Sequence, residues 1–238
     1  DARKEQVGKE QEENRWGVQN RPRKVGEKLY VCGNLNKVVA LNAATGVEEW
    51  TLDPGLSPEN VHYTPSCRTL AYYADPAEVT AADASQTPAA CARRIILGTL
   101  DARVIELDAS TGKRCADFGN NGEVSITADM GEVYKGYVAI TSPPVVVRNT
   151  IVVGHETSDG QRLDSPAGVT KALDVKTGAL KWAWDAATPF DTAPRQGKDV
   201  YKRGSPNVWA PFSGDDKLGL VYLPVANASG DYYSSTRT

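Results

Sequence analysis

The sequence has 238 residues, a formal net charge of −3 and 40% hydrophobic residues, which is enough apolar material for one large domain or two small ones. The weakly acidic balance predicts no nucleic-acid partner, and no apolar run reaches the roughly 18 residues of a membrane-spanning helix. The four cysteines permit three complete disulfide pairings, and the sequence alone does not choose among them. With two histidines and no CxxC motif, a zinc site is not expected.

The chain begins with a charged segment of mixed sign over residues 1–15, which predicts a lead-in outside the folded domain. After it, short segments alternate between apolar and polar residues, as half-buried β-strands do. In chain order, strands are expected at residues 28–31, 37–41, 94–97, 104–107, 144–147, 150–153, 168–173, 180–184 and 218–223. No segment keeps the helical period, so the sequence predicts an all-β fold. The stretches 54–91, 118–140 and 186–206 are expected to be long irregular loops.

An internal repeat organises these strands. Residues 40–50 (ALNAATGVEEW) match residues 172–182 (ALDVKTGALKW), and residues 106–112 (ELDASTG) form a shorter copy without the closing Trp. The glycines of the three copies are spaced 66 residues apart, and each ends a tight turn between two strands. A repeat of this length with only strand signals is typical of propeller blades. Trp50 and Trp182 close their copies and are expected to pack between neighbouring blades.

Several short motifs occur in a fixed order along the chain. They are LYVC at 29–32, CARRII at 91–96, TSPP at 141–144, SPNVWAP at 205–211 and LVYLP at 220–224. The ordered set resembles the membrane-bound dehydrogenases that use pyrroloquinoline quinone (PQQ), of the glucose, quinate/shikimate and glycerol types. The resemblance implies that residues 16–238 form about three four-stranded blades of an eight-bladed quinoprotein propeller, a partial β-propeller that continues beyond residue 238.

The resemblance assigns four residues to the cofactor. Arg68 matches an arginine that pairs with a PQQ carboxylate, for which a guanidinium offers a bidentate fork. Thr141 matches a threonine at the cofactor's polar edge, and Trp209 matches the tryptophan that forms the floor under the quinone ring. His62 precedes Cys67 by five residues instead of the three in glucose-type relatives, so a structural role competes with a cofactor role. The other three also have ordinary alternatives: a surface ion pair, a strand-starting threonine and a core tryptophan.

The resemblance also implies a divalent ion, Ca²⁺ or Mg²⁺, which bridges the cofactor and takes oxygen ligands. The metal-binding glutamate of the family falls at Ser165 in this chain, so Asp164, one residue earlier, is the carboxylate candidate. Asn227, which follows the LVYLP motif, matches a second oxygen donor. Asp164 and Asn227 are therefore the predicted metal ligands.

The positions of the cysteines indicate which branch of the family the chain resembles. Alcohol-oxidising relatives have two adjacent cysteines, whereas Cys67 lies between Ser66 and Arg68, so the resemblance points to the sugar and polyol branch. Cys91 and Cys115 flank an expected hairpin whose register brings their regions together. A Cys91–Cys115 disulfide is therefore favoured.

By resemblance, the chain is part of an enzyme that oxidises a sugar or polyol, with glucose as the first expectation and quinate/shikimate or glycerol as alternatives. Electrons are expected to pass to ubiquinone, in a periplasmic protein attached to the bacterial inner membrane by regions outside this sequence. The family's catalytic aspartate follows a His-Asp-Leu-Trp-Asp type motif that the sequence lacks. No catalytic residue is therefore predicted, and the chain by itself is expected to be inactive.

A non-enzymatic periplasmic propeller scaffold is the competing hypothesis, because such scaffolds also need the repeat glycines and tryptophans. That hypothesis gives no reason for Arg68, Thr141 and Trp209 to occur together. A dehydrogenase with another class of cofactor is disfavoured, because no GxGxxG motif follows a strand.

Overall fold

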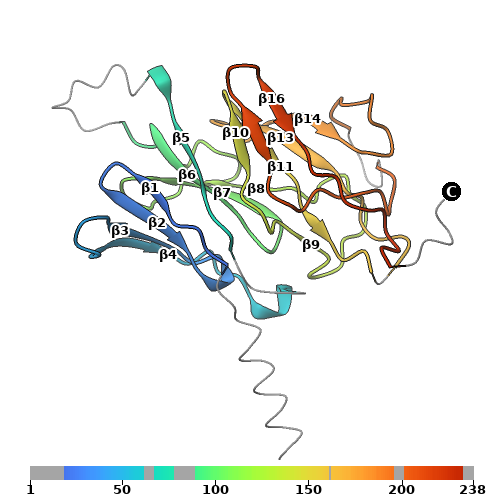
Figure 1. Ribbon diagram of the computed structural model, residues 1–238, viewed down its shortest axis with the longest axis horizontal. Helices are drawn as coiled ribbons and strands as arrows, with labels where there is room; N and C mark the ends of the chain where they lie inside the picture. Colours follow the sequence, from blue (N-terminus) through green and yellow to red (C-terminus); the bar gives the residue numbers. More distant parts are fainter. Residues whose placement is uncertain (1–18, 62–66, 78–88, 161, 196–200, 233–238) are drawn as a thin grey trace, which may run out of the picture.

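The computed structural model describes residues 19–61, 67–77, 89–160, 162–195 and 201–232. Three four-stranded antiparallel sheets lie side by side and are followed by a two-stranded sheet. In Figure 1 they run as an arc from blue (β1–β4) through green (β5–β8) to yellow and orange (β10–β14) and red (β15 and β16). The expected all-β fold with about three four-stranded blades is confirmed.

The strands of each four-stranded sheet are hydrogen-bonded in chain order. The first sheet contains β1 (Arg23–Val25), β2 (Lys28–Cys32), β3 (Val38–Asn42) and β4 (Glu48–Leu52). The second contains β5 (Ala71–Ala74), β6 (Arg93–Gly98), β7 (Arg103–Asp108) and β8 (Glu123–Ser125). The third contains β10 (Val145–Val147), β11 (Thr150–Val153), β13 (Thr170–Asp174) and β14 (Leu180–Trp184).

Two smaller sheets and two short helical turns complete the described structure. The smaller sheets pair β15 (Ser213–Asp215) with β16 (Leu220–Tyr222), and β9 (Val138–Ala139) with β12 (Glu156–Thr157). The 3₁₀ turns are η1 (Asn34–Asn36) and η2 (Pro58–Asn60). No helix among the described residues is long and apolar enough to cross a bilayer.

All nine strands expected from the sequence are present, but the expectation of purely irregular loops was wrong in part. Strand β5 lies within the stretch 54–91, and β8 and β9 lie within 118–140. These strands have two to four residues, which is too short for alternation to be recognised in the sequence. They form because the neighbouring strands offer unpaired backbone groups.

The sequence repeat corresponds to one turn that occurs three times. The first residue of each turn, Asn42, Asp108 or Asp174, accepts hydrogen bonds through its side-chain oxygen from the backbone N–H groups two and three residues later. Its carbonyl accepts a further hydrogen bond from the N–H of the repeat glycine. Each glycine has a φ between 71° and 73°, a left-handed conformation that favours glycine. The repeat is therefore a structural requirement of the blade.

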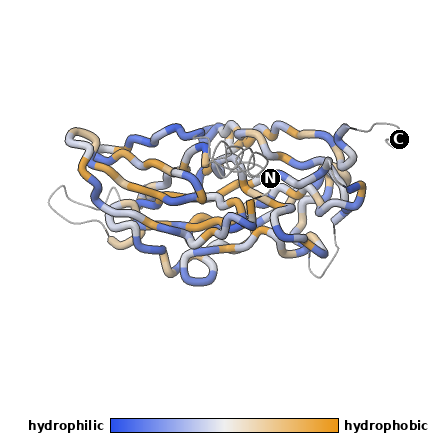
Figure 2. The backbone as a smooth tube through the Cα atoms, turned by 90° about the horizontal axis from the view of Figure 1, so that it is seen from below, coloured by the Kyte–Doolittle hydropathy of each residue, from blue (hydrophilic) through white to orange (hydrophobic). Residues whose placement is uncertain are grey.

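Neighbouring blades share buried apolar cores. Ile95 and Leu97 of β6 pack in a cluster with residues of the first sheet, whereas Ile96 packs in a cluster with residues of the third sheet. Successive side chains of a strand point to opposite faces of its sheet, so one central strand contributes to both cores. Figure 2 shows apolar (orange) segments running through the interior, with many hydrophilic (blue) segments at the periphery.

Trp50 joins the first blade to the second. A Cβ added at Gly112 would lie 2.5 Å from Cε3 of Trp50, so the indole occupies the space beside the glycine turn of the next blade. Trp50 Nε1 and Tyr30 Oη both donate hydrogen bonds to the carbonyl of Ala109, at 3.3 Å and 2.8 Å. The packing role expected for Trp50 is confirmed.

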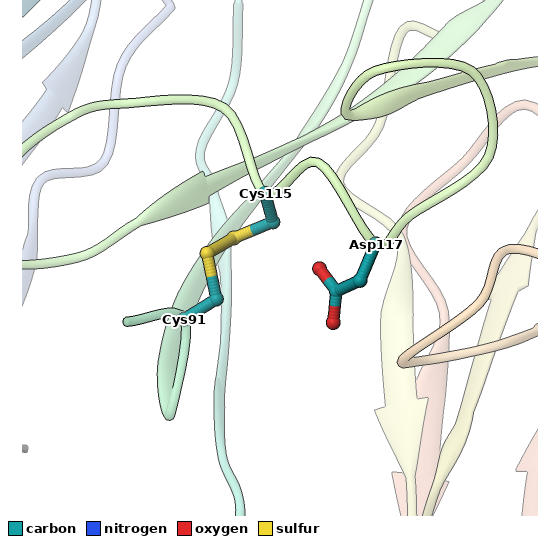
Figure 3. Close-up of side chains that lie close together, drawn as sticks. All are labelled: Cys91, Cys115 and Asp117. Carbon is teal, nitrogen blue, oxygen red and sulfur yellow. A yellow bond between two sulfur atoms is a disulfide. The ribbon is translucent and has the colours of Figure 1, made fainter. Parts of the chain in front are cut away.

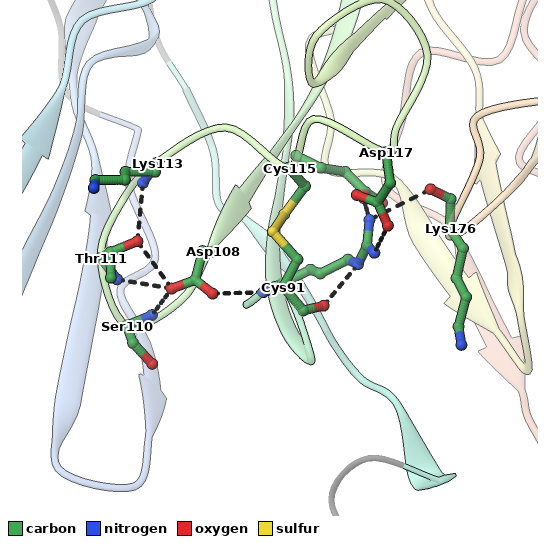
Figure 4. The surroundings of a disulfide bond; sticks show 10 residues. Cys91, Asp108, Ser110, Thr111, Lys113, Cys115, Asp117 and Lys176 are labelled. Carbon is green, nitrogen blue, oxygen red and sulfur yellow. Dashed lines mark hydrogen bonds and ion pairs between the residues drawn. A yellow bond between two sulfur atoms is a disulfide. The ribbon is translucent and has the colours of Figure 1, made fainter. Parts of the chain in front are cut away.

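Both pairs of cysteines form disulfides, Cys32–Cys67 and Cys91–Cys115, so the favoured Cys91–Cys115 pairing is confirmed. The second disulfide closes the hairpin of β6 and β7, beside Asp108, whose Oδ2 accepts a hydrogen bond from the Cys91 N–H at 2.7 Å. Figure 4 shows this carboxylate between the glycine turn and the disulfide.

Two glycines in equivalent turns provide a test of the blade contact. Gly112→Ala is expected to lower the free energy of unfolding by about 3 kcal/mol, because the new methyl group would overlap Trp50 in addition to requiring a left-handed alanine. Gly46→Ala is the matched control: Gly46 has a φ of 73° but no atom within 4 Å of the added Cβ, so the expected cost is about 1–2 kcal/mol. Chemical unfolding of the two variants measures the difference. Equal losses would contradict a packing role for Trp50.

Candidate functional site

The loops that lead into the first strand of each sheet carry the predicted cofactor residues. Strand β10 contacts both β5 and β15, so these first strands face one another along the inside of the arc. The residues four and three positions before each first strand are Gln19 and Asn20, Cys67 and Arg68, Thr141 and Ser142, and Trp209 and Ala210. The blade repeat therefore brings residues from four distant parts of the chain to one end of the inner strands.

Arg68 connects three of these loops. Its Nη1 donates hydrogen bonds to the carbonyl of Thr141 at 3.2 Å and to Oγ of Ser142 at 2.9 Å. Its Cζ lies 5.4 Å from the centroid of the Trp209 ring, within the range of a cation–π interaction. The hydroxyl groups of Ser142 and Thr141 both donate to the carbonyl of Trp209, at 2.6 Å and 3.3 Å. The structure thus brings Arg68, Thr141 and Trp209 into direct contact.

Every partner of the Arg68 guanidinium among the described residues is neutral. Besides the contacts above, Arg68 Nε donates to Oε1 of Gln19 at 3.4 Å, and no described carboxylate forms an ion pair with it. Arg94 and Arg103, by contrast, each pair with two carboxylates. The Arg68 guanidinium therefore lies beside an aromatic face with no described carboxylate within ion-pair distance, an arrangement suited to an anionic ligand.

Two hollows flank this contact. One, of about 460 Å³, is lined by Gln19, Asn20, Arg21, Arg68, Thr69, Pro143 and Pro211. The other, which we call the Trp209 hollow, measures about 580 Å³ and is lined by Glu156, Thr157, Asp159, Trp209, Ala210, Pro224, Val225, Ala226, Asn227, Asp231 and Tyr232. Its volume is in the range of small-molecule sites. Trp209 is 41% exposed, so part of this large aromatic surface is available to a ligand.

Glu156 supplies a partly buried carboxylate to the Trp209 hollow. Strand pairing with Ala139 fixes its backbone at the edge of the β9–β12 sheet. Burial raises the pKa of Glu156 to about 7; the charge of Arg68 opposes this increase and that of Asp159 adds to it. A carboxyl group in this state ionises readily when a cation is placed beside it.

Further oxygen donors line the same hollow. The Asp159 carboxylate accepts a hydrogen bond from Asn207 Nδ2 at 3.0 Å, which orients it. Asn227 Nδ2 donates to Oδ1 of Asp231 at 2.7 Å, so its amide oxygen is the remaining acceptor of that side chain. The Trp209 hollow therefore combines three carboxylates with an amide oxygen, the donor chemistry that Ca²⁺ and Mg²⁺ prefer.

The two predicted metal residues are found in different surroundings. Asn227 lines the Trp209 hollow. Asp164 is exposed, lies outside that lining and receives two hydrogen bonds from Arg162, both at 2.8 Å. Ser165, where relatives have a glutamate, is buried and donates its hydroxyl to the carbonyl of Ser158 at 3.0 Å. The geometry favours Glu156 and Asp159 over Asp164 as the carboxylates near the cofactor residues.

Neither histidine adds a described side chain to the candidate site. His62 lies outside the described residues. His155, next to Glu156, is 1% exposed, and burial lowers its pKa to about 4. It is a neutral core histidine.

A second cluster of potential metal ligands, Cys91, Cys115 and Asp117, has a different function. Figure 3 shows the two sulfur atoms bonded to each other with the carboxylate beside them. Oxidised sulfur is a poor ligand, because metals bind the thiolate. Asp117 instead pairs with Arg94, which also binds Glu106 at 2.5 Å. This cluster stabilises the hairpin.

The sequence analysis missed Ser142, Glu156 and Asp159. Ser142 could have been found from its position, because it is equivalent to Arg68 in the next blade. Glu156 and Asp159 follow β11 in a stretch with no recognisable repeat, so only the folded chain brings them to Trp209.

Comparison with known proteins agrees with this architecture. Residues 1–238 match the family described as PQQ, glucose/ethanol/alcohol dehydrogenase, β-propeller domain. The chain belongs to this family. It is 40% identical over 227 residues to the glycerol dehydrogenase large subunit of Gluconobacter oxydans, covering 94% of this chain and 29% of the relative. It is 36% identical over 217 residues to the quinoprotein glucose dehydrogenase of Escherichia coli, covering 91% of this chain and 27% of the relative.

The fold is also similar to that of a solved member of the wider group. The quinohemoprotein alcohol dehydrogenase from Comamonas testosteroni superimposes with a TM-score of 0.64 at 22% identity, over 90% of this chain and 30% of that chain. The present chain thus spans less than a third of the length of these proteins and corresponds to a portion of the PQQ propeller.

The described residues fit the cofactor of the family. PQQ is a flat polycarboxylate, and Trp209 offers a flat surface while Arg68 offers a cation without a carboxylate partner among the described residues. Burial raises the pKa of Glu156, and the positive charge of Arg68 opposes this increase. The oxygen donors of the Trp209 hollow are of the type that divalent ions bind.

A pH series tests the state of Glu156. Because burial raises the folded-state pKa above its ordinary value of 4.5 to about 7, ionisation destabilises the metal-free protein progressively between those pH values. Glu156→Gln is therefore expected to be more stable than the unaltered protein at pH 8, on the order of 1–2 kcal/mol, and equally stable near pH 4. Chemical unfolding across this range measures the effect, with Glu27→Gln on an exposed turn as the control. Parallel pH profiles of stability for the unaltered protein and Glu156→Gln would refute a raised pKa of Glu156.

Proposed function

We propose that the chain forms one wall of the PQQ site in a dehydrogenase that oxidises a hydroxyl group of a polyol or sugar. The observation that carries this proposal is the Arg68 guanidinium, which lies 5.4 Å from the Trp209 ring without a described carboxylate partner. An ordinary surface arginine would be hydrated or paired with a carboxylate. An arginine held by neutral groups over an aromatic plane is suited to a flat anionic cofactor.

Each residue has a distinct task in this proposal. Trp209 supports one face of the cofactor, and Arg68 pairs with one of its carboxylates while the Thr141 carbonyl and Ser142 hydroxyl hold the guanidinium in place. Glu156, Asp159 and Asn227 supply oxygen ligands to the divalent ion. When bound, the quinone supplies the two-electron oxidant for a C–H bond next to the substrate hydroxyl. We assign no general base among the described residues.

The relatives support a proposal for the substrate, the electron acceptor and the location. The higher identity to a glycerol dehydrogenase subunit than to a glucose dehydrogenase supports a small polyol, while glucose remains an alternative. We propose a quinone, such as ubiquinone, as the electron acceptor. The two disulfides are suited to an oxidising compartment such as the periplasm, where we place the complete protein.

Replacement of Arg68 tests the cofactor assignment. Arg68→Ala is expected to weaken PQQ binding by roughly 10- to 100-fold, because a charge-assisted hydrogen bond is lost. Arg195→Ala is the control, since Arg195 also lies over an aromatic ring, at 5.0 Å from Tyr201, but outside both hollows. Equilibrium titration of the complete apoprotein with PQQ, followed by absorbance, gives both affinities. Absence of PQQ binding by the unaltered protein would favour the scaffold hypothesis.

Two aspartates distinguish the alternative metal sites. Asp159→Asn is expected to weaken Ca²⁺ binding about ten-fold or more, because one anionic ligand is removed. Asp164→Asn is expected to leave it within about two-fold, since the Asp164 carboxylate is occupied by Arg162. Calorimetric titration with Ca²⁺ measures both. A larger loss of Ca²⁺ affinity in Asp164→Asn than in Asp159→Asn would establish Asp164 as the ligand.

A further inference from the structure

The two disulfides lie in different relations to the cofactor residues. Cys32, the last residue of β2, bonds to Cys67, which immediately precedes Arg68. Both sulfur-bearing residues are buried, at 1% and 6% exposure. This bond therefore joins the first blade to the loop that carries the guanidinium. The Cys91–Cys115 bond lies within the second blade and touches neither hollow among the described residues.

Core packing of Cys67 and Leu70 and a small number of hydrogen bonds also restrain the segment around Arg68. Residues 67–70 precede β5 and belong to no strand, so no sheet ladder fixes their backbone. Three hydrogen bonds connect these residues to the first blade: the Arg21 N–H donates to the Arg68 carbonyl at 2.7 Å, Thr69 Oγ1 donates to the Arg21 carbonyl at 2.7 Å, and Arg23 Nε donates to the Leu70 carbonyl at 3.1 Å. Asn20, next to Arg21, in turn donates to the Cys32 carbonyl. The disulfide and these hydrogen bonds form a closed loop that includes the backbone of Arg68.

The contacts of the Arg68 guanidinium depend on the position of the Arg68 backbone. The side chain reaches across to Ser142 at 2.9 Å and to the Trp209 ring at 5.4 Å, on the loops of two other blades. A long, flexible side chain maintains such contacts only when its Cα is held at the right place. The disulfide supplies the one covalent restraint, next to Arg68 in the chain.

We propose that the Cys32–Cys67 disulfide is a positioning element of the cofactor site, which holds the backbone of Arg68 so that its guanidinium stays between Ser142 and Trp209. This inference rests on the proposed PQQ function and adds a requirement to it. Loss of this bond lowers PQQ affinity while the propeller remains folded, whereas loss of the other bond affects stability alone.

The two disulfides provide a matched experiment in the complete protein. The paired substitutions Cys32→Ala and Cys67→Ala are expected to raise the dissociation constant for PQQ about ten-fold or more, approaching the effect of Arg68→Ala. The paired substitutions Cys91→Ala and Cys115→Ala are expected to leave it within about two-fold. Both variants lose the entropic restraint of a cross-link and should show lowered Tm values of similar size.

Combination with Arg68→Ala separates positioning from general destabilisation. If the disulfide acts through Arg68, removing it in the Arg68→Ala background should change PQQ affinity by less than about two-fold, because the two effects share one contact. A further ten-fold loss in that background would overturn the proposal. So would equal effects of the two disulfides on PQQ affinity.

A second measurement applies if the Cys32/Cys67 variant does not fold. The Cys91/Cys115 variant retains one disulfide, which a dithiol such as dithiothreitol reduces to two thiols while the reagent becomes a cyclic disulfide. Because PQQ oxidises dithiols, the reagent is removed before the titration; the reduced variant is then expected to bind PQQ about ten-fold more weakly, with unchanged circular dichroism. Unchanged affinity after reduction would overturn the inference and leave the proposed function intact. No PQQ binding by the unaltered protein would overturn both.

Discussion

The contact between Arg68, Ser142 and Trp209 is the interaction on which the candidate site depends. It joins the loops before β5, β10 and β15, and its hydrogen bonds at 2.9 Å and 2.6 Å pass from a guanidinium through a hydroxyl to a backbone carbonyl. None of these partners carries a charge. The contact therefore orders three blades relative to one another and leaves a cation directed toward the space beside an aromatic ring. Structural order and ligand recognition are achieved by the same side chain.

The blade repeat explains why such a contact can form between residues so far apart in the chain. Each repeat has the same hydrogen-bonded turn and the same order of strands, so the loop before each first strand arrives at the same end of the sheet. Trp50 and its contact with Gly112 fix the spacing of the first two blades. The site is thus assembled from equivalent positions of successive blades, with one residue type selected at each position for its chemistry.

The Trp209 hollow carries an energetic cost in the absence of a ligand. Glu156 is partly buried without a lysine or arginine in hydrogen-bonding distance among the described residues, and burial raises its pKa to about 7. Glu106, by contrast, forms a buried ion pair with Arg94, although burial raises its pKa as well. Glu156 has no such ion pair among the described residues, an arrangement suited to a ligand for a cation.

The all-β fold, the blade period and the turn glycines could be predicted from the sequence, because these depend on local alternation and on a backbone conformation that favours glycine. The sequence also singled out Arg68, Thr141 and Trp209, since each lies in a short motif of recognisable order. Only the tertiary structure decided which acidic residues accompany them. Asp164 is near the expected position in the chain but is paired with Arg162, whereas Glu156 and Asp159 reach the Trp209 hollow through the fold of the β9–β12 sheet and its loop. The pairing of Cys32 with Cys67 was likewise a tertiary outcome, because it depends on how the first blade packs against the second.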